Sequence, residues 1–225
     1  MRFLKKFNTE EEYEAYLNSE DFVRPCVARI VDDKAVRYKK RYKNGVYVQH
    51  VDGKLFTTEQ WTEKGFSGSD ANGVALITSN VQYVIAKTDA SAGYTLWSSS
   101  TSKVDGATVA YSFDKAKNDF AGEVNTAIIA NEVSGAATLC IDYIVPNGQS
   151  GYLPALGELR EACEHKTDVE SAMSLIDGES FAAMWSSTQK AGTDAWVIHW
   201  SNNVSSAYSK NSTNGVVRAF APLNY

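Results

Sequence analysis

Three apolar segments near the C-terminal end decide the fold: MWSST at 184–188, DAWVIHW at 194–200 and VVRAFAP at 216–222. Between the last two lies a stretch, 201–215, in which nine of fifteen residues are Ser or Asn. Only Val204 and Tyr208 in this stretch are bulky and apolar or aromatic. Rigid strand-like segments on either side of small polar residues predict a surface on which these polar side chains are exposed to a partner. A catalytic centre would instead need a few titratable groups in fixed places.

The overall composition is that of an ordinary globular protein, with 225 residues, 44% hydrophobic and 22% charged. This length allows one large domain, or one domain plus a small one. The net charge of −5 and the isoelectric point near 5.3 argue against a binder of nucleic-acid phosphates, which usually carries a basic face. A basic run at 34–43 is interleaved with two tyrosines and is interpreted as the solvated face of a hairpin, not a nucleic-acid patch.

The three cysteines, Cys26, Cys140 and Cys163, have spacings that fit neither a disulfide framework nor a zinc motif. Cys140 lies in an apolar run and is predicted to be a small core residue. The first residues carry charge but no following apolar region of signal-peptide length, and no stretch approaches the ~20 apolar residues of a membrane span. We therefore expect a chain made in the cytoplasm without an N-terminal export signal; association with a virion stays open.

Residues 1–64 are predicted to form a small β-rich module with one helix at 10–18, where a capping-box pattern begins. Turn dipeptides predict a hairpin at Asn44-Gly45 and another turn at Asp52-Gly53, and strands are expected at 23–30 and 34–38. Residues 65–73 are rich in Gly, Ser, Asn and Asp, which predicts a linker or long loop. The second domain is accordingly expected to span 65–225.

The second domain is predicted to run from strands to helices and back to strands. Apolar runs predict strands at 73–77 and 81–86, and 88–108 is polar and rich in turn residues. Helices are predicted at 127–130, 135–143, 153–162 and 168–176, and strands follow from Met184. This order is typical of an α+β fold rather than a repeated βαβ unit.

Several segments together resemble the C-type-lectin-like fold in its calcium-free, formylglycine-generating-enzyme-like branch. They are GVALI (73–77), DFAGEVNT (119–126), PNGQSGYLPALGEL (146–159), WSST (185–188), Trp196, Trp200 and VRAF (217–220). More narrowly, the chain is similar to the variable proteins of diversity-generating retroelements found in gut Bacteroidetes and their phages. The resemblance covers about residues 73–222, and its motifs are fairly specific together and weak singly. The N-terminal module resembles, more loosely, the small β module that precedes such domains in phage-derived structural proteins.

In that family an error-prone reverse transcriptase rewrites template adenines, so that Asn-type codons give a wide choice of residues on a fixed strand framework. The resemblance implies that one set of residues between Lys190 and Gly215, which we term the display residues, lines a ligand surface. Tyr208 is open to two interpretations, as an aromatic binding anchor or as a side chain packed inward beside Val204. The display residues are Gly192, Thr193, Asp194, His199, Asn203, Ser205, Ser206, Tyr208, Ser209, Asn211, Ser212, Thr213 and Asn214.

The alternation of side chains along a strand assigns the residues around the display residues to two opposite faces. In 194–200, Trp196, Ile198 and Trp200 fall on one face and His199 on the other. We expect the tryptophans, with Trp185, to be core residues rather than ligand-stacking residues. Without the resemblance, the polar stretch 201–215 would be interpreted as a solvated hairpin or loop with no partner.

The sequence predicts no catalytic, metal or cofactor site. His50, His165 and His199 lack ligand spacing, and Ser186-Ser187-Thr188 has no nucleophile-elbow frame, which favours a strand hydroxyl ladder. Calcium-binding segments of the lectin type are missing, and the PNG sequence at 146–148 is interpreted as a turn. The late cysteine pair of formylglycine-generating enzymes is missing too, because Cys163 is the last cysteine and lies on a predicted helix.

One charged residue in the final apolar segment needs a partner. Arg218 would share a strand face with Val216 and Phe220, and an arginine is costly to bury alone. We predict that it pairs with a helix carboxylate, Glu158 first.

The function favoured by these features is recognition of a cell-surface protein or glycan by the display residues, without chemistry or cofactor. Polar surfaces of this kind bind modestly and gain ~10²–10⁴ from multivalency. We therefore expect a homo-oligomer, for example a trimer, or attachment to a larger particle through the N-terminal module. The alternative is a phage tail or virion structural protein with a lectin-like fold and no diversified site; an unrecognised enzyme is the third hypothesis.

Overall fold

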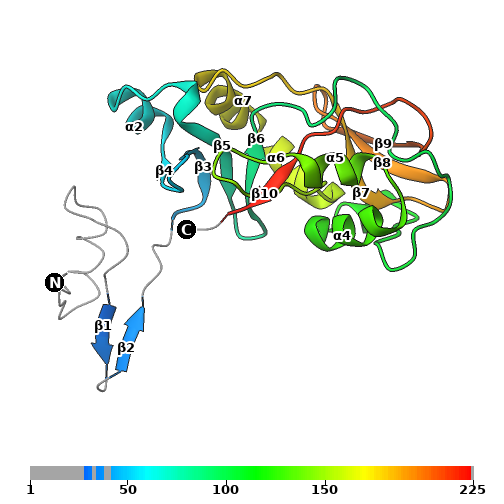
Figure 1. The fold of residues 1–225 in the computed structure, drawn as a ribbon, viewed down its shortest axis with the longest axis horizontal. Helices are drawn as coiled ribbons and strands as arrows, with labels where there is room; N and C mark the ends of the chain where they lie inside the picture. The colour runs from blue at the N-terminus through cyan, green and yellow to red at the C-terminus, as the bar shows by residue number, and fades with distance from the viewer. Residues whose placement is uncertain (1–27, 32–33, 38–41, 224–225) are drawn as a thin grey trace. The chain divides into compact units, whose positions relative to one another are not determined.

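The computed structural model describes residues 28–31, 34–37 and 42–223 (Figure 1). Contacts divide the chain into a unit at Met1–Tyr42 and a second unit at Lys43–Asn224. In the first unit, β1 (Ala28–Val31) pairs antiparallel with β2 (Lys34–Arg37), which matches the two predicted strands in part. The predicted helix at 10–18 and Cys26 lie outside the described residues. The boundary between the units falls earlier in the chain than the predicted boundary at residues 64 and 65.

The second unit contains a five-stranded antiparallel sheet in the order β10-β6-β5-β3-β4. Its strands are β3 (Gly45–His50), β4 (Leu55–Phe56), β5 (Ala71–Ile77), β6 (Gln82–Ala86) and β10 (Phe220–Pro222). The earlier boundary follows from this sheet, because β3 pairs with β5 along its whole length. The C-terminal strand β10 pairs with β6, so the sheet joins sequence segments from both ends of the unit.

Two predictions for the N-terminal part of this sheet were wrong. Asn44-Gly45 does not form the predicted hairpin turn, since Gly45 already begins β3. The loop predicted at 65–73 contains a 3₁₀ turn, η1 (Gly68–Asp70), and the first residues of β5. The turn at Asp52-Gly53 is confirmed; it connects β3 to β4, and Gly53 adopts a φ of 86°.

Six helices accompany the sheets among the residues described. The short α2 (Thr58–Glu63) has a capping box in which Thr57 and Gln60 bond reciprocally. Near the middle of the chain lie α3 (Phe113–Ala116), α4 (Gly122–Glu132) and α5 (Ala136–Asp142), and then α6 (Leu156–Glu164) and α7 (Lys166–Leu175). The four predicted helices correspond to α4–α7, although α4 begins before its predicted start. Mixed helices and antiparallel sheets confirm the α+β class.

A second sheet carries the C-terminal strands, in the order β7-β8-β9. These antiparallel strands are β7 (Ala183–Gln189), β8 (Asp194–His199) and β9 (Val204–Ser209). Within the second unit this sheet lies at the end opposite to α2 and β4 (Figure 1). The strands predicted at 184–188 and 194–200 are therefore confirmed, whereas the predicted strand at 216–222 forms only at β10 and in the other sheet. The third strand here is β9, an edge strand that pairs with β8 and lies inside the polar stretch.

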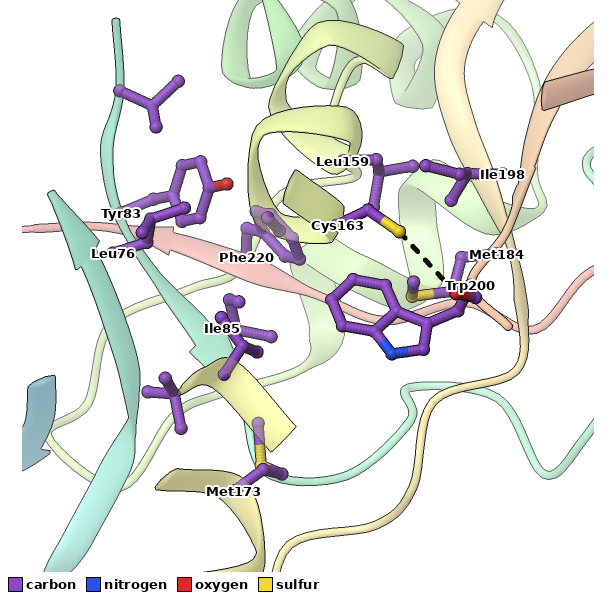
Figure 2. Close-up of a cluster of buried hydrophobic side chains, with 14 of the residues drawn as sticks. Leu76, Tyr83, Ile85, Leu159, Cys163, Met173, Met184, Ile198, Trp200 and Phe220 are labelled. Atoms are coloured by element: carbon purple, nitrogen blue, oxygen red, sulfur yellow. Dashed lines mark hydrogen bonds between the residues drawn. The ribbon is translucent and has the colours of Figure 1, made fainter. Parts of the chain in front are cut away.

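One hydrophobic core joins the two sheets through α6 and α7. Figure 2 shows Leu159 and Cys163 of α6 between Ile85 of β6 on one side and Trp200, which follows β8, on the other. The Cys163 thiol lies 3.7 Å from the Trp200 carbonyl oxygen. Full burial of an aliphatic side chain such as Ile85 contributes about 1.5–3 kcal/mol, so this shared core ties the second sheet to the first.

Candidate functional site

The display residues lie along the outer edge of the three-stranded sheet. They occupy the β7–β8 loop, the first and last residues of β8, the β8–β9 turn, the edge strand β9 and the turn that follows it. Thr193, Asn211 and Thr213 are exposed, and the other ten are half-buried. All thirteen positions are described by the structure, and each retains accessible surface.

A buried framework lies beneath this surface. Trp185, Trp196 and Trp200 are 0%, 6% and 2% exposed, which confirms that they are core residues. Each indole N–H has a fixed acceptor: the Thr95 carbonyl for Trp185, the Ala110 carbonyl for Trp196 and the Glu170 carboxylate for Trp200. Hydrogen-bonded indoles in a close-packed core fix the strand positions. The framework is thus specified by residues outside the display set.

His199 and Tyr208 are brought together on one face of β8 and β9. The Tyr208 hydroxyl lies 3.2 Å from His199 Nε2, and the rings meet edge to face with centroids 5.9 Å apart. The strand register puts His199 on the face opposite to Trp196, as predicted. That face is covered at its centre, because Val197 is fully buried. The open part of the surface is therefore the edge strand and its loops.

Lys210 is a buried residue inside the polar stretch that the sequence analysis did not single out. Its side chain is fully buried, and its ammonium donates hydrogen bonds to three acceptors: the Ser102 carbonyl (2.7 Å), the Gly192 carbonyl (2.8 Å) and Gln189 Oε1 (2.7 Å). The ammonium also lies 4.7 Å from the centroid of Trp97. Burial lowers the pKa of Lys210 to about 8, with Asp194 acting in the opposite direction. Lys210 therefore ties two loops to the end of β9.

Asn203 combines a display position with a backbone constraint. Its φ of 57° lies in the left-handed region, which Asn, Asp and Gly adopt more readily than other residues. Its carbonyl accepts a hydrogen bond from Arg160 Nη1 at 3.2 Å. The neighbouring Asn202 side chain accepts the Val204 N–H at 3.1 Å. Substitution at Asn203 is thus restricted by the turn as well as by any ligand.

The hydroxyls of Ser186, Ser187 and Thr188 are buried in β7 and bonded within the protein. Ser186 donates to the Trp196 carbonyl, Thr188 donates to Asp119, and Asn125 donates to Ser187. None of these bonds joins a hydroxyl to a histidine. The arrangement is that of a polar packing network and provides no activated nucleophile.

Histidines and carboxylates do not gather into a metal centre in the described part of the chain. No group of three or more His, Cys, Asp or Glu residues there could hold a metal ion. His50 packs against Phe66 and contacts Asp52, while His199 contacts Tyr208. What the display surface offers chemically is a set of hydroxyl, amide and aromatic groups for hydrogen bonding and contact.

The predicted partner of Arg218 was wrong. Arg218 is fully buried, and its Nε donates to Asp89 Oδ1 at 2.5 Å rather than to Glu158. Its guanidinium also donates to the carbonyls of Ala86, Lys87 and Ser180 and lies over the ring of Phe181, 4.9 Å from the centroid. The acceptors belong to the last residue of β6, the loop after it and the segment before β7. Arg218 consequently links the five-stranded sheet to the segment that leads into the second sheet.

Glu158 lies instead in a buried site of its own at the start of α6. Its carboxyl accepts the Ala155 N–H at 2.7 Å and lies 3.5 Å from the Tyr152 hydroxyl. Burial raises its pKa from the ordinary 4.5 to about 8; the bond from Ala155 opposes this rise and the charge of Asp119 adds to it. Glu158 is therefore protonated in the folded protein at neutral pH.

We expect Glu158→Gln to remove a pH dependence of stability. The folded pKa lies above the unfolded one, so the contribution of Glu158 is fully present below about pH 4.5 and is lost as the pH rises to about 8. The loss is about 1.4 kcal/mol per pH unit within this window. Urea unfolding at pH 5 and pH 8 measures this change. The free energy of unfolding of the variant should rise relative to that of the wild type as the pH rises. Glu132→Gln, at an exposed position, is the control; equal pH profiles for Glu158→Gln and the wild type would contradict the assignment.

No match to this chain was found among protein-family models, curated proteins or solved structures. Among the described residues, the helices are all too short or too polar to cross a membrane.

Proposed function

We propose that the protein recognises a ligand through its display residues and performs no chemistry. The observation that carries the proposal is the separation of two groups of residues within one short segment. All thirteen display residues have accessible side chains or backbone, while the tryptophans, Lys210 and Arg218 that hold the segment are buried. A surface whose side chains can change without disturbing its support is suited to recognition.

The chemistry of the display residues supports a macromolecular ligand such as a cell-surface protein or glycan. Ser, Thr and Asn side chains give adaptable hydrogen bonds, and the half-buried Tyr208 adds rigid aromatic contact area. The lectin-like fold and the retroelement-type diversification are parts of the same proposal. Oligomerisation through the N-terminal unit would add the avidity that a modest polar surface needs.

Sequencing this gene across its native population tests the proposal. We expect substitutions to concentrate at the thirteen display positions, with the codons for Trp185, Trp196 and Lys210 unchanged. At Asn203 the substitutions should favour Asp and Gly, because its φ is positive. A nearby copy of the segment, mismatched mainly at adenines and adjacent to a reverse transcriptase gene, would support the retroelement mechanism. Substitutions spread evenly over exposed positions of the whole chain would contradict the proposal and favour a structural role.

A further inference from the structure

A cleft of about 380 Å³ lies outside the display residues, between α3, α6 and the turn that joins β5 to β6. Its volume is within the range of about 300–1,000 Å³ that small-molecule sites occupy. The cleft adjoins the display surface through Arg160, whose Nη1 donates to the Asn203 carbonyl. Its lining nevertheless comes from residues 80–164, and so it is independent of any variation in the C-terminal segment.

Two phenylalanines form apolar walls of the cleft. Phe113 and Phe120 are 37% and 39% exposed, although side chains of this size are usually buried. The position of Phe113 is fixed by stacking: the Arg160 guanidinium lies 4.9 Å from its ring centroid and the Lys117 ammonium 5.7 Å. Aromatic surface is thus held open to solvent beside polar side chains.

The charged groups that line the cleft are balanced in number. Lys117 and Arg160 are the cations and Glu161 and Glu164 the anions, so the lining has no excess of either sign. Glu161 is oriented by hydrogen bonds from Thr78 (2.8 Å) and Asn80 (3.3 Å). The Arg160–Glu164 ion pair is loose, at 3.9 Å, and the side chain of Glu164 is 58% exposed.

We propose that this cleft binds a neutral saccharide unit. A pyranose ring has an apolar face of C–H groups that packs on a phenyl ring, and its neighbouring hydroxyls both donate and accept hydrogen bonds. Guanidinium, carboxylate and carboxamide groups supply matching pairs of donors and acceptors. A balanced lining gives no net attraction for a free anion or cation, which separates this ligand class from carboxylates and amines.

Ligand-observed saturation-transfer NMR on the full chain tests the proposal with four probes: the methyl glycosides of glucose, mannose and galactose, and N-acetylglucosamine. We expect saturation transfer to the ring protons of at least one probe, with a Kd of about 1 mM. Phe120→Ala should weaken that binding by about tenfold or more. Glu164→Ala, at a largely exposed side chain, should also weaken it, which covers the case in which the phenylalanine variant folds poorly.

The control variant is Ile144→Ala, because Ile144 is 58% exposed and lies outside the cleft. It should bind the probe as the wild type does. The proposal is overturned if no probe shows transfer, or if transfer survives both cleft variants. Propionate and butylammonium serve as charged comparators, and stronger binding of either one in the cleft would equally overturn it.

Discussion

Arg218→Met is expected to lower the free energy of unfolding by about 3–5 kcal/mol, the cost of removing one partner of a buried ion pair. The substitution leaves Asp89, whose side chain is 15% exposed, without its cation. It also leaves the carbonyls of Ala86, Lys87 and Ser180 without their donor. At about 2–4 °C per kcal/mol for a chain of this size, the melting temperature should fall by roughly 10 °C. Differential scanning calorimetry measures this change.

A double variant makes the experiment specific for the pair. Asp89→Asn together with Arg218→Met removes both charges, and we expect it to recover part of the loss, because the two residues are in contact. Glu158→Gln together with Arg218→Met should show additive effects, since Glu158 has its own partners. A melting temperature within 1 °C of the wild type for Arg218→Met would show that the Arg218–Asp89 contact does not stabilise the fold.

Lys210→Met is expected to loosen the loops that carry the first display residues, at an overall cost of about 2 kcal/mol. Methionine fills most of the same volume but cannot donate to the Ser102 and Gly192 carbonyls. Buried acceptors without donors weaken the segments to which they belong. The substitution should therefore open the β7–β8 loop and the loop around Ser102 locally, and leave the five-stranded sheet unaffected.

Amide hydrogen exchange distinguishes this local effect from general destabilisation. The amides of Ser98 and Lys210 bond to the Lys210 and Thr193 carbonyls, and so they report on the junction. Both should exchange faster in Lys210→Met, while β5 amides keep their protection. Lys190→Met is the control, because it makes the same change at a half-buried lysine. The Lys190 ammonium lies 5.7 Å from the centroid of the Trp196 ring rather than at the acceptors of Lys210. Unchanged exchange at Ser98 and Lys210 would contradict the assigned role.

Apolar spacing was sufficient to predict the α+β class, the helices α4–α7 and the strands β7 and β8. It did not predict β9, which lies inside the polar stretch 201–215. It failed where tertiary contacts decide the structure. Asn72 and Gly73 look like loop residues, yet they lie inside β5: Asn72 bonds to the Gln49 side chain, and a Cβ at Gly73 would collide with the Ile85 carbonyl. A glycine at the beginning of an apolar run is a signal of such close approach.

The sequence predicted the region of the candidate site but not the buried charged residues that hold it in place. Alternation in 194–200 placed the tryptophans in the core and His199 on the opposite face. Lys210 gave no such signal, because a lysine among serines and asparagines is ordinarily exposed. Its acceptors at 102, 189 and 192 come together only in the folded chain. The same holds for Arg218, whose partner Asp89 lies 129 residues away in a polar loop.

The separation between display residues and their framework is tested most directly by a substitution scan of residues 183–222 for resistance to proteolysis. We expect most substitutions at the thirteen display positions to leave resistance unchanged, with Asn203 limited by its φ. Substitutions at Trp185, Trp196, Lys210 and Arg218 should lower it, since these residues are buried. If the display positions proved as intolerant as the framework, the surface would be a structural part of the fold, and recognition through exchangeable side chains would be contradicted.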